Sequence, residues 1–257
     1  MILFSSHRNG VHDSQIYTMN PDGSGQRILV NAKGHSWGPR VSPDGKFLVF
    51  STVIGSHAVH TATGGGEQGT GHHEIFRART DGSDITQIST TGDTVWNNAW
   101  AWTPDSKSVV FASDRDGNWE LYRMNADGSN VVRLTTNTAQ DGWPTITPDG
   151  KSIVFASDRD GAKESSQLYM MDIDGKNVRR LVFSESYDTL PSISPDGKSV
   201  VYSSQSNGLG EIYALDLASL ATTRLTSTVA MNTDPSFSPD GRRSSSPPTA
   251  MGTRTST

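Results

Sequence analysis

The chain has 257 residues, of which 33% are hydrophobic, with 25 glycines, 12 prolines and no cysteine. This length allows one domain, and so many turn-forming residues suit short strands better than long amphipathic helices. The formal net charge of -5 gives no basic field for a phosphate backbone, so we expect no nucleic-acid partner; the lack of cysteine excludes disulfides and thiolate metal sites.

The first residues predict a strand and no membrane-spanning segment. Residues 1–4 are apolar, but they lead directly into the polar residues 5–8. No apolar run in the chain approaches the roughly 18 residues of a membrane span. We therefore expect no membrane insertion and no signal peptide within this chain, and an export leader would lie upstream of Met1.

A repeat runs through the chain. Each copy contains Ser or Thr, then Pro-Asp, then Gly or Ser and a basic residue; the copies are residues 42–46, 103–107, 147–151, 194–198 and 238–242. Their aspartates, at positions 44, 105, 149, 196 and 240, are 61, 44, 47 and 44 residues apart. A period in the mid-forties is the length of one four-stranded propeller blade.

Every copy predicts the same strands in the same order. A first strand contains a proline, which donates no ladder hydrogen bond and so marks an edge strand; these prolines are residues 39, 144, 191 and 235. The Pro-Asp-Gly turn then reverses the chain into an apolar second strand, at residues 47–50, 109–111, 153–155 and 200–202. In a propeller, the edge strand is the innermost strand and faces the central channel.

A third strand carries Ile or Leu before an aromatic residue, at residues 16–17, 75–76, 121–122, 168–169 and 212–213. An Asp-Gly hairpin turn follows at residues 22–23, 81–82, 127–128 and 174–175. Fourth strands end near residues 29, 88, 134, 181 and 225. These elements predict an all-β fold, a β-propeller of five four-stranded repeats over residues 1–242.

The turn, the Val-Phe-x-Ser strand and the Ile-Tyr strand resemble the WD-like propeller repeat of the TolB family, from residue 1 to about residue 242. The resemblance implies a non-catalytic binding module at the cell envelope, periplasmic or extracellular. TolB itself is periplasmic, binds a lipoprotein partner and has an α/β domain before its propeller; this chain resembles the propeller part. Similar repeats also form the propeller of prolyl-oligopeptidase-like hydrolases.

The two ends allow two arrangements. The chain opens on a second strand, residues 2–6, and its last copy provides a first strand, residues 235–238. The C-terminal strand can join the N-terminal blade and close a ring without open edges. The alternative is an open fragment of a propeller with six or more blades.

Residues 243–257 are rich in Ser, Pro and Thr and predict a disordered tail. Read from the third base of each codon from Arg243 onward, this segment permits isoleucine or valine followed by V-F-S-S-H-R-D-G-N-x-D-V-Y. That string parallels residues 110–122, so we hypothesise a frameshift near residue 242 or 243 and a parent with a further blade. Coding DNA with incompatible third bases would exclude it.

Polar residues occur seven positions before each turn proline: Ser36, Asn97, Asp141, Asp188 and Asn232. On the propeller interpretation they surround one mouth of the channel and, with Trp37, Trp96 and Trp143, form the predicted binding site for a protein, peptide or small ligand. The alternatives are that the polar residues cap the loop before the first strand and that the tryptophans pack between blades.

An insertion of roughly residues 53–73 contains the weak metal-ligand candidates His57, His60, His72 and His73. A mobile solvated loop is the alternative, because a glycine-rich segment does not preorganise ligands. Residues 114–118 and 158–161 resemble calcium loops, yet position 12 is Asn125 or Tyr169 where an EF-hand needs Glu, so they are first of all turns. Weak calcium binding is the alternative there, and we expect no cofactor.

Catalytic signatures are missing from the sequence. It contains no Gly-x-Ser-x-Gly elbow, no His-Glu-x-x-His and no phosphate-binding glycine loop. We therefore expect a non-catalytic, monomeric binding module. The alternative is the propeller domain of a prolyl-oligopeptidase-like hydrolase or of a polysaccharide-active enzyme whose catalytic part is missing.

Overall fold

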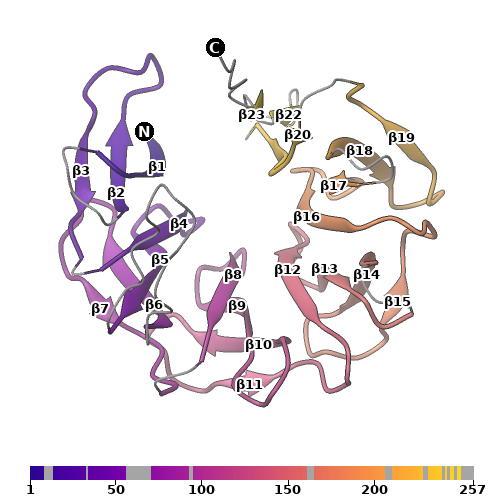
Figure 1. The fold of residues 1–257 in the computed structure, drawn as a ribbon, viewed down its shortest axis with the longest axis horizontal. Coiled ribbons are helices and arrows are strands. Elements are labelled where there is room, and N and C mark those ends of the chain that lie inside the picture. Colours follow the sequence, from indigo (N-terminus) through magenta and orange to yellow (C-terminus); the bar gives the residue numbers. More distant parts are fainter. Residues whose placement is uncertain are drawn as a thin grey trace, which may run out of the picture. The chain divides into compact units, whose positions relative to one another are not determined.

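A computed structural model of the chain describes residues 1–8, 14–32, 34–55, 71–92, 95–160, 165–205, 210–227, 231–238, 241, 244–245 and 248–249. All regular elements in these residues are β-strands (Figure 1). The described residues contain no helix long and apolar enough to cross a membrane. The chain divides into two compact units, Met1–Arg133 and Leu134–Thr257, which we describe separately.

The first unit contains three antiparallel sheets in chain order. The first has three strands: β1 (Ile2–Ser6), β2 (Gln15–Met19) and β3 (Arg27–Val30). The second has four: β4 (Ser36–Val41), β5 (Phe47–Ile54), β6 (His72–Arg79) and β7 (Thr86–Gln87). The third has four: β8 (Asn97–Trp102), β9 (Ser108–Ser113), β10 (Glu120–Asn125) and β11 (Val132–Arg133).

The second unit repeats this pattern twice. One four-stranded sheet contains β12 (Asp141–Ile146), β13 (Ser152–Ser157), β14 (Gln167–Asp172) and β15 (Arg179–Arg180). The next contains β16 (Asp188–Ile193), β17 (Ser199–Ser204), β18 (Glu211–Asp216) and β19 (Thr222–Arg224). Two short pairs follow: β20 (Met231–Asn232) with β23 (Pro248–Thr249), and β21 (Ser236–Phe237) with β22 (Ser244–Ser245).

The predicted turn between the first and second strands has a self-contained hydrogen-bond network. In the turn before β13, the Thr147 hydroxyl donates to Asp149 Oδ1 at 2.6 Å, and the Lys151 amide donates to the same atom at 3.0 Å. The hydrogen bond from Thr147 is the largest cause that lowers the pKa of the Asp149 carboxyl, and the bond from Lys151 lowers it further. Gly150 adopts a φ of 70°, which glycine accepts without strain. The sequence motif thus fixes the reversal locally.

The prolines at residues 39, 144 and 191 lie on edge strands, as predicted, and the structure places each of them at a β-bulge, which the sequence did not predict. β12 pairs only with β13 among the described strands, and its register shifts between Gly142 and Thr145. Trp143, immediately before Pro144, has a positive φ of 50°. The bulge interrupts the ladder where proline has no amide hydrogen to donate. β16 repeats the same bulge, so the feature belongs to the repeat.

Glycines of the Asp-Gly turns allow one sheet to touch the backbone of the preceding sheet. A Cβ on Gly128, between β10 and β11, would lie 2.2 Å from the carbonyl oxygen of Ile88. Gly82 and Gly175 make equivalent approaches to Leu29 and Leu134. In the four-stranded sheets, the second strands are buried except at their ends and form apolar clusters with the facing sheets inside each unit. The core therefore lies between successive sheets.

The strand pattern of the repeat is confirmed, while the count of five four-stranded repeats stays a prediction. The described residues form four four-stranded sheets, one three-stranded sheet and two two-stranded sheets. The boundary at residue 242 and the disordered tail stay predictions as well. Most residues of that tail lie outside the described part of the chain.

Candidate functional site

The five predicted polar residues occupy equivalent places, and all are buried. Four of them begin a first strand and have 0% relative exposure: Ser36, Asn97, Asp141 and Asp188. Asn232 lies in β20 and is 6% exposed. The residues beside them are more accessible to a ligand than these buried side chains. We therefore follow first their hydrogen bonds and then their exposed neighbours.

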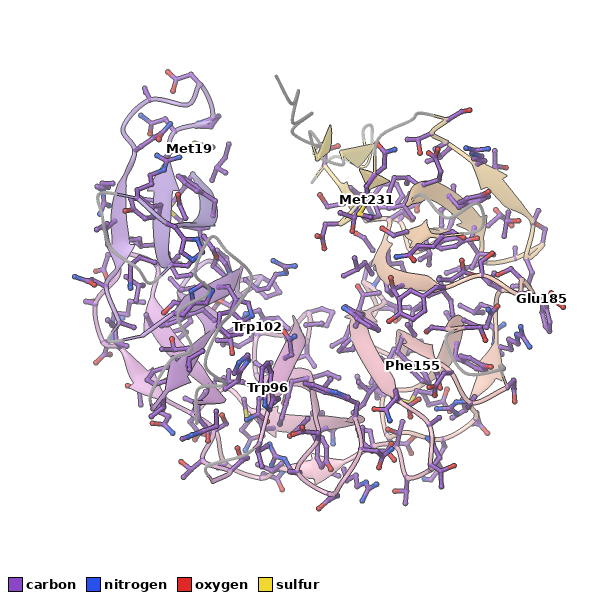
Figure 2. All side chains as sticks on the ribbon, in the orientation of Figure 1. Met19, Trp96, Trp102, Phe155, Glu185 and Met231 are labelled. Atoms are coloured by element: carbon purple, nitrogen blue, oxygen red, sulfur yellow. The ribbon has the colours of Figure 1, made fainter. Side chains whose placement is uncertain are left out.

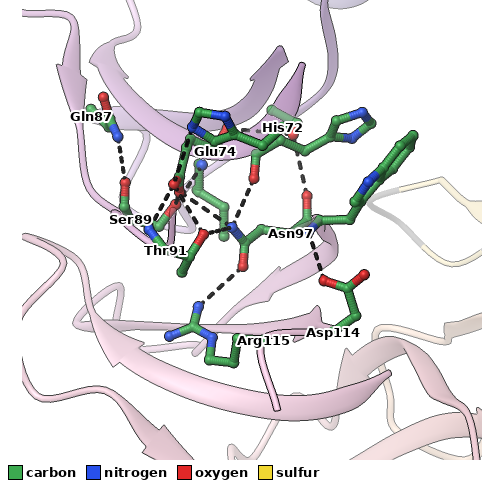
Figure 3. A network of polar contacts seen from close by, with 12 residues as sticks. His72, Glu74, Gln87, Ser89, Thr91, Asn97, Asp114 and Arg115 are labelled. Atoms are coloured by element: carbon green, nitrogen blue, oxygen red, sulfur yellow. Dashed lines mark hydrogen bonds and ion pairs between the residues drawn. The ribbon is translucent and has the colours of Figure 1, made fainter. Parts of the chain in front are cut away.

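Asn97 lies at the centre of a buried polar network in the first unit (Figure 3). Its Nδ2 donates to the His73 carbonyl at 2.7 Å, to Thr91 Oγ1 at 3.1 Å and to Glu74 Oε2 at 3.2 Å. Its Oδ1 accepts from Arg115 Nη2 at 3.1 Å. All polar atoms of the side chain are thus used, which fixes the start of β8.

Glu74, the third residue of β6, is the second centre of this network (Figure 3). Its side chain is fully buried and accepts hydrogen bonds from the Thr91 amide at 2.8 Å, the Thr91 hydroxyl at 3.0 Å and the Ser89 hydroxyl. His72 Nε2 lies 3.8 Å from Glu74 Oε1. The carboxylate therefore holds the connection that leads from β7 to β8.

The other polar residues are bound inside their own sheets. Arg159 Nη2 donates to both carboxylate oxygens of Asp141 at 2.9 Å. The Ser36 and Thr52 hydroxyls are 2.9 Å apart, and Ser184 Oγ donates to Asp188 Oδ2 at 2.6 Å. These contacts provide the capping of first strands that the sequence offered as an alternative to ligand binding.

The residue before each buried polar residue is more accessible than the polar residue itself. Trp96, before Asn97, is 44% exposed, and its backbone is clamped to the next loop. The Trp96 amide donates to Asp114 Oδ1 at 2.7 Å, and the Asp114 amide donates to the Trp96 carbonyl at 3.3 Å. Trp96 immediately precedes β8, and Trp102 is the last residue of that strand (Figure 2). A rigid backbone therefore presents an exposed indole.

Four rings form a continuous row in the first unit, which we call the aromatic row: His35, Trp37, His73 and Trp96. The centroids of His35 and Trp37 are 5.1 Å apart, those of Trp37 and His73 are 4.5 Å apart, and those of His73 and Trp96 are 3.7 Å apart. His73 is 8% exposed, whereas Trp37 and His35 are half-buried. The row thus passes from a buried imidazole to exposed ring surface.

Two further tryptophans, Trp143 and Trp102, differ in their roles. Trp143 packs partly buried against the core between its two sheets, and its ring meets Tyr187 edge-on with centroids 6.3 Å apart. Trp102 is a core residue, 8% exposed, whose Nε1 donates to the Arg40 carbonyl at 3.1 Å. Of the predicted tryptophans, Trp37 and Trp96 therefore come together in one row.

The metal candidates do not come together among the described residues. His57 and His60 lie outside those residues, and His73 belongs to the aromatic row. No group of three His, Cys, Asp or Glu side chains within the described residues is arranged to hold a metal ion. In the calcium-like loops, Asp116 and Asp160 accept hydrogen bonds from Tyr122 at 2.6 Å and Tyr169 at 2.7 Å. Burial is the largest cause that raises the pKa of both tyrosines, and these hydrogen bonds raise it further.

Sequence reasoning missed a second row of polar residues. Buried Glu or Gln begins or nearly begins each third strand: Gln15, Glu74, Glu120, Gln167 and Glu211. In the later copies an arginine 13 residues onward binds it, as Arg224 Nη2 does at 2.8 Å from Glu211 Oε1. The signal was present, because each of these residues immediately precedes the Ile or Leu of the third-strand motif.

Comparison with known proteins matches this architecture. Residues 87–210 match the family model of the TolB β-propeller domain. A TolB homolog of Chlorobium chlorochromatii is 30% identical over 144 residues, which cover 56% of this chain and 28% of that protein. An uncharacterized protein of Agrobacterium fabrum is 35% identical over 135 residues, 49% of this chain and 40% of that protein. The chain thus spans less than half the length of these curated relatives.

Solved structures share the fold. TolB of Acinetobacter baumannii superposes with a TM-score of 0.71 at 23% identity, over 93% of this chain and 56% of that one. A puromycin hydrolase superposes at 0.63, with 20% identity over 91% of this chain and 37% of that one. An oligogalacturonate lyase of Vibrio parahaemolyticus superposes at 0.65, with 16% identity over 93% of this chain and 65% of that one.

The sheets, their repeated turns and their packing define the chain as a β-propeller. Its repeats are similar to the TolB β-propeller domain, whose family model matches residues 87–210.

Proposed function

We propose that the chain is a non-catalytic binding module that recognises a partner through the aromatic row. One observation carries the proposal: Trp96 is 44% exposed, yet its ring centroid lies 3.7 Å from that of His73 and its backbone is fixed to Asp114. An exposed indole held in one position provides contact area at little cost in conformational entropy. The partner class is a protein, a peptide or a small ligand with an apolar face.

The buried polar residues support this surface from beneath. The hydrogen bonds of Asn97 to His73 and Arg115 connect the strand that follows Trp96 to its neighbours. A binding site on a sheet framework keeps its geometry better than one on loops alone. In this proposal Ser36 and Asn97 position the row, and Trp37 and Trp96 make contact. Asp141, Trp143, Asp188 and Asn232 occupy the equivalent first-strand positions of the second unit.

A cell-envelope location, periplasmic or extracellular, is part of the proposal. It follows from the similarity to TolB proteins and from the family's implied role. The chain spans 28% of the Chlorobium relative, so the activity and partners of the whole relative are carried over only as a proposal.

Photo-crosslinking tests the role of the aromatic row. We would replace Trp96 by p-benzoylphenylalanine in the full chain and irradiate it with envelope extract from cells that produce the protein. Phe183, which is 73% exposed in the second unit, provides the matched control position. We expect an adduct of defined mass from position 96, lost when Trp37→Ala is added, and none of that mass from position 183. Identical adducts from both positions, or none from position 96, would contradict the proposal.

An enzyme-associated propeller is the second candidate, because a puromycin hydrolase and an oligogalacturonate lyase share the fold. Incubating the purified chain with aminoacyl p-nitroanilides and with oligogalacturonate measures hydrolase and lyase activity directly. We expect no turnover. Turnover that co-purifies with the chain would favour this second candidate over the binding module.

A further inference from the structure

Three sheets hold an arginine on a pair of aromatic rings beside a serine hydroxyl. In the first sheet this arginine is Arg8, which lies over Phe4 and Tyr17 and donates to Ser6 Oγ. In the third and fourth sheets the arginine also binds the first strand. In the third sheet, the Arg115 guanidinium lies 5.1 Å from the Phe111 ring centroid and 4.6 Å from that of Tyr122, and its Nε donates to Ser113 Oγ at 3.0 Å. As described above, its Nη2 also reaches the first residue of the first strand. The guanidinium thus contacts two aromatic rings with its face and donates hydrogen bonds from its edge.

The fourth sheet repeats this arrangement with a carboxylate. Arg159 lies 5.1 Å from the Phe155 centroid and 4.9 Å from the Tyr169 centroid. Its Nε donates to Ser157 Oγ at 2.9 Å, and its Nη2 donates to Asp141 at 2.9 Å. Four components therefore define the site: two stacked rings, a serine hydroxyl and the residue that begins the first strand.

The fifth sheet has all four components but lacks the arginine. The rings of Tyr202 and Tyr213 stack with centroids 5.8 Å apart, and the register pairs Tyr202 with Tyr213 and Asp188 with Ser204. The fourth sheet has the same register, with Phe155 opposite Tyr169 and Asp141 opposite Ser157. At the position of Arg159, two residues after the serine, this copy has Ser206. We call Asp188, Tyr202, Ser204 and Tyr213 the guanidinium socket.

The carboxylate of the guanidinium socket is incompletely paired. Asp188 has 0% exposure, and its Oδ1 has no hydrogen-bond partner among the described residues. The nearby Arg180 is engaged elsewhere: its side chain donates to Gln167 Oε1 at 3.0 Å and to the Val182 carbonyl at 2.8 Å. Desolvation accordingly raises the pKa of Asp188. Burying a carboxylate without a cation costs folding free energy. A bound cation would offset that cost at Asp188.

The second sheet also lacks the arginine, but it has no carboxylate at the start of its first strand. There Ile54 takes the arginine position, and the first strand begins with the neutral Ser36, bonded to Thr52. The fifth sheet instead keeps the carboxylate and loses only the guanidinium. Tyr213 is also half-buried, whereas Tyr122 and Tyr169, which lie beneath arginines, are 2% exposed. One ring of the guanidinium socket thus has surface left for contact.

We propose that the guanidinium socket binds the guanidinium group of an arginine side chain of a partner protein. Arginine fits better than lysine, since a planar guanidinium stacks on the rings while donating hydrogen bonds at its edge to Asp188 and Ser204. An ammonium group provides the charge without the stacking plane. The guanidinium socket lies in the second unit and does not include the aromatic row. The tests of the two sites are therefore independent.

Calorimetric titration of the full chain with N-acetylarginine methylamide tests the proposal. We expect saturable binding that weakens at least tenfold with the neutral citrulline analogue and severalfold with the lysine analogue. Asp188→Asn should weaken arginine binding at least tenfold. Equal binding of the citrulline analogue, or unchanged affinity in Asp188→Asn, would overturn the proposal. If free arginine or agmatine binds more tightly than the capped residue, the proposal that the arginine belongs to a partner protein is wrong. The ligand would then be a small metabolite.

Ser206→Arg provides a second variant that should not unfold the chain. In the sequence repeat, position 206 corresponds to position 159, so we expect an arginine introduced there to compete with the added analogue. We expect loss of arginine-analogue binding together with a higher Tm than the wild type. A variant that still binds the analogue with unchanged affinity would contradict the proposal. Circular dichroism of both variants confirms that lost binding does not arise from lost fold.

Discussion

At the scale of single residues, chemically similar side chains behave differently because their partners differ. Asp141 and Asp188 begin equivalent strands and are equally buried, yet only Asp141 has an arginine on its carboxylate. Gly23 and Gly128 occupy equivalent turns with similar φ values of 83° and 87°. Only Gly128 faces the backbone of a preceding sheet. Each pair therefore provides a matched comparison within one chain.

Gly128→Ala should destabilise the protein far more than Gly23→Ala. Both introduce a Cβ at positive φ, which costs about 1–2 kcal/mol. At position 128 the Cβ would also meet the Ile88 carbonyl at 2.2 Å, whereas at position 23 nothing lies within 4 Å. Overpacking adds about 1–3 kcal/mol, so we expect about 2–5 kcal/mol for Gly128→Ala. Urea unfolding followed by circular dichroism measures both; equal losses would show that the two sheets can separate at this turn without cost.

Asp188→Asn should change the pH dependence of stability. The pKa of Asp188 is raised in the folded state, so the folded protein binds the proton more tightly than the unfolded chain. Its contribution to stability is therefore present below the unfolded pKa of about 3.9 and is lost as the pH rises through the folded pKa. Asp188→Asn removes this loss, and we expect a higher Tm than the wild type at pH 7 without ligand.

The control for this prediction is Asp149→Asn, which should act in the opposite direction. The pKa of Asp149 is lowered by its hydrogen bonds with Thr147 and Lys151, so its contribution is present at neutral pH and lost on acidification. Thermal unfolding between pH 3 and pH 8 separates the two. A lower Tm for Asp188→Asn at pH 7 would show that the charged carboxylate is favourably solvated in the folded protein.

At the scale of elements, the loop between the second and third strands of the third and fourth sheets connects to the first strand of the same sheet. Arg159, in the loop after β13, binds Asp141 at the start of β12 and stacks on Phe155 of β13 and Tyr169 of β14. One side chain thus joins three strands at the end of a sheet. The surface pair of Lys176 and Asp174, in the turn between β14 and β15, has a similar distance of 2.9 Å but joins no separate strands.

Arg159→Met should cost much more stability than Lys176→Met. The first substitution leaves Asp141 buried without its cation, and breaking a buried pair costs about 3–5 kcal/mol. The second removes an exposed pair whose side chains are 76% and 49% accessible, worth about 0–1 kcal/mol. Chemical denaturation of both variants measures the difference. Similar losses would mean that water replaces the guanidinium at Asp141.

At the scale of the whole molecule, the same burial gradient recurs in every complete sheet. Second strands are paired on both sides and buried, as in the 0% exposure of Val109, Val110 and Phe111 in β9. Fourth strands are short and open; the three residues of β19 are all exposed. Repeat proteins derive stability from each repeat and its neighbours, so local opening should follow this gradient.

Hydrogen exchange should therefore show protection with the period of the repeat. We expect the slowest amide exchange in β5, β9, β13 and β17 and the fastest in β7, β11, β15 and β19. Mass spectrometry of exchanged, protease-digested protein measures this pattern. Uniform protection along each sheet would contradict it and would indicate that a sheet opens as one unit.

Much of the fold was predictable because the decisive interactions are local. The Thr147 hydroxyl, Asp149 and Gly150 close their turn without help from the rest of the chain, and the apolar second strands follow directly. For the candidate site, the recurring polar positions were found, but not their burial. Whether Asn97 or the adjacent Trp96 reaches the surface depends on how β8 packs against its neighbours.

The sequence by itself determined the repeat, the all-β class and the edge position of the proline strands, because turn chemistry and side-chain alternation act over a few residues. Only the tertiary structure decided which side chains meet. His35, Trp37, His73 and Trp96 come from segments up to 61 residues apart and form one row. The stacked tyrosines and the carboxylate of the guanidinium socket likewise meet only when three strands pair, since register brings together residues that the chain separates.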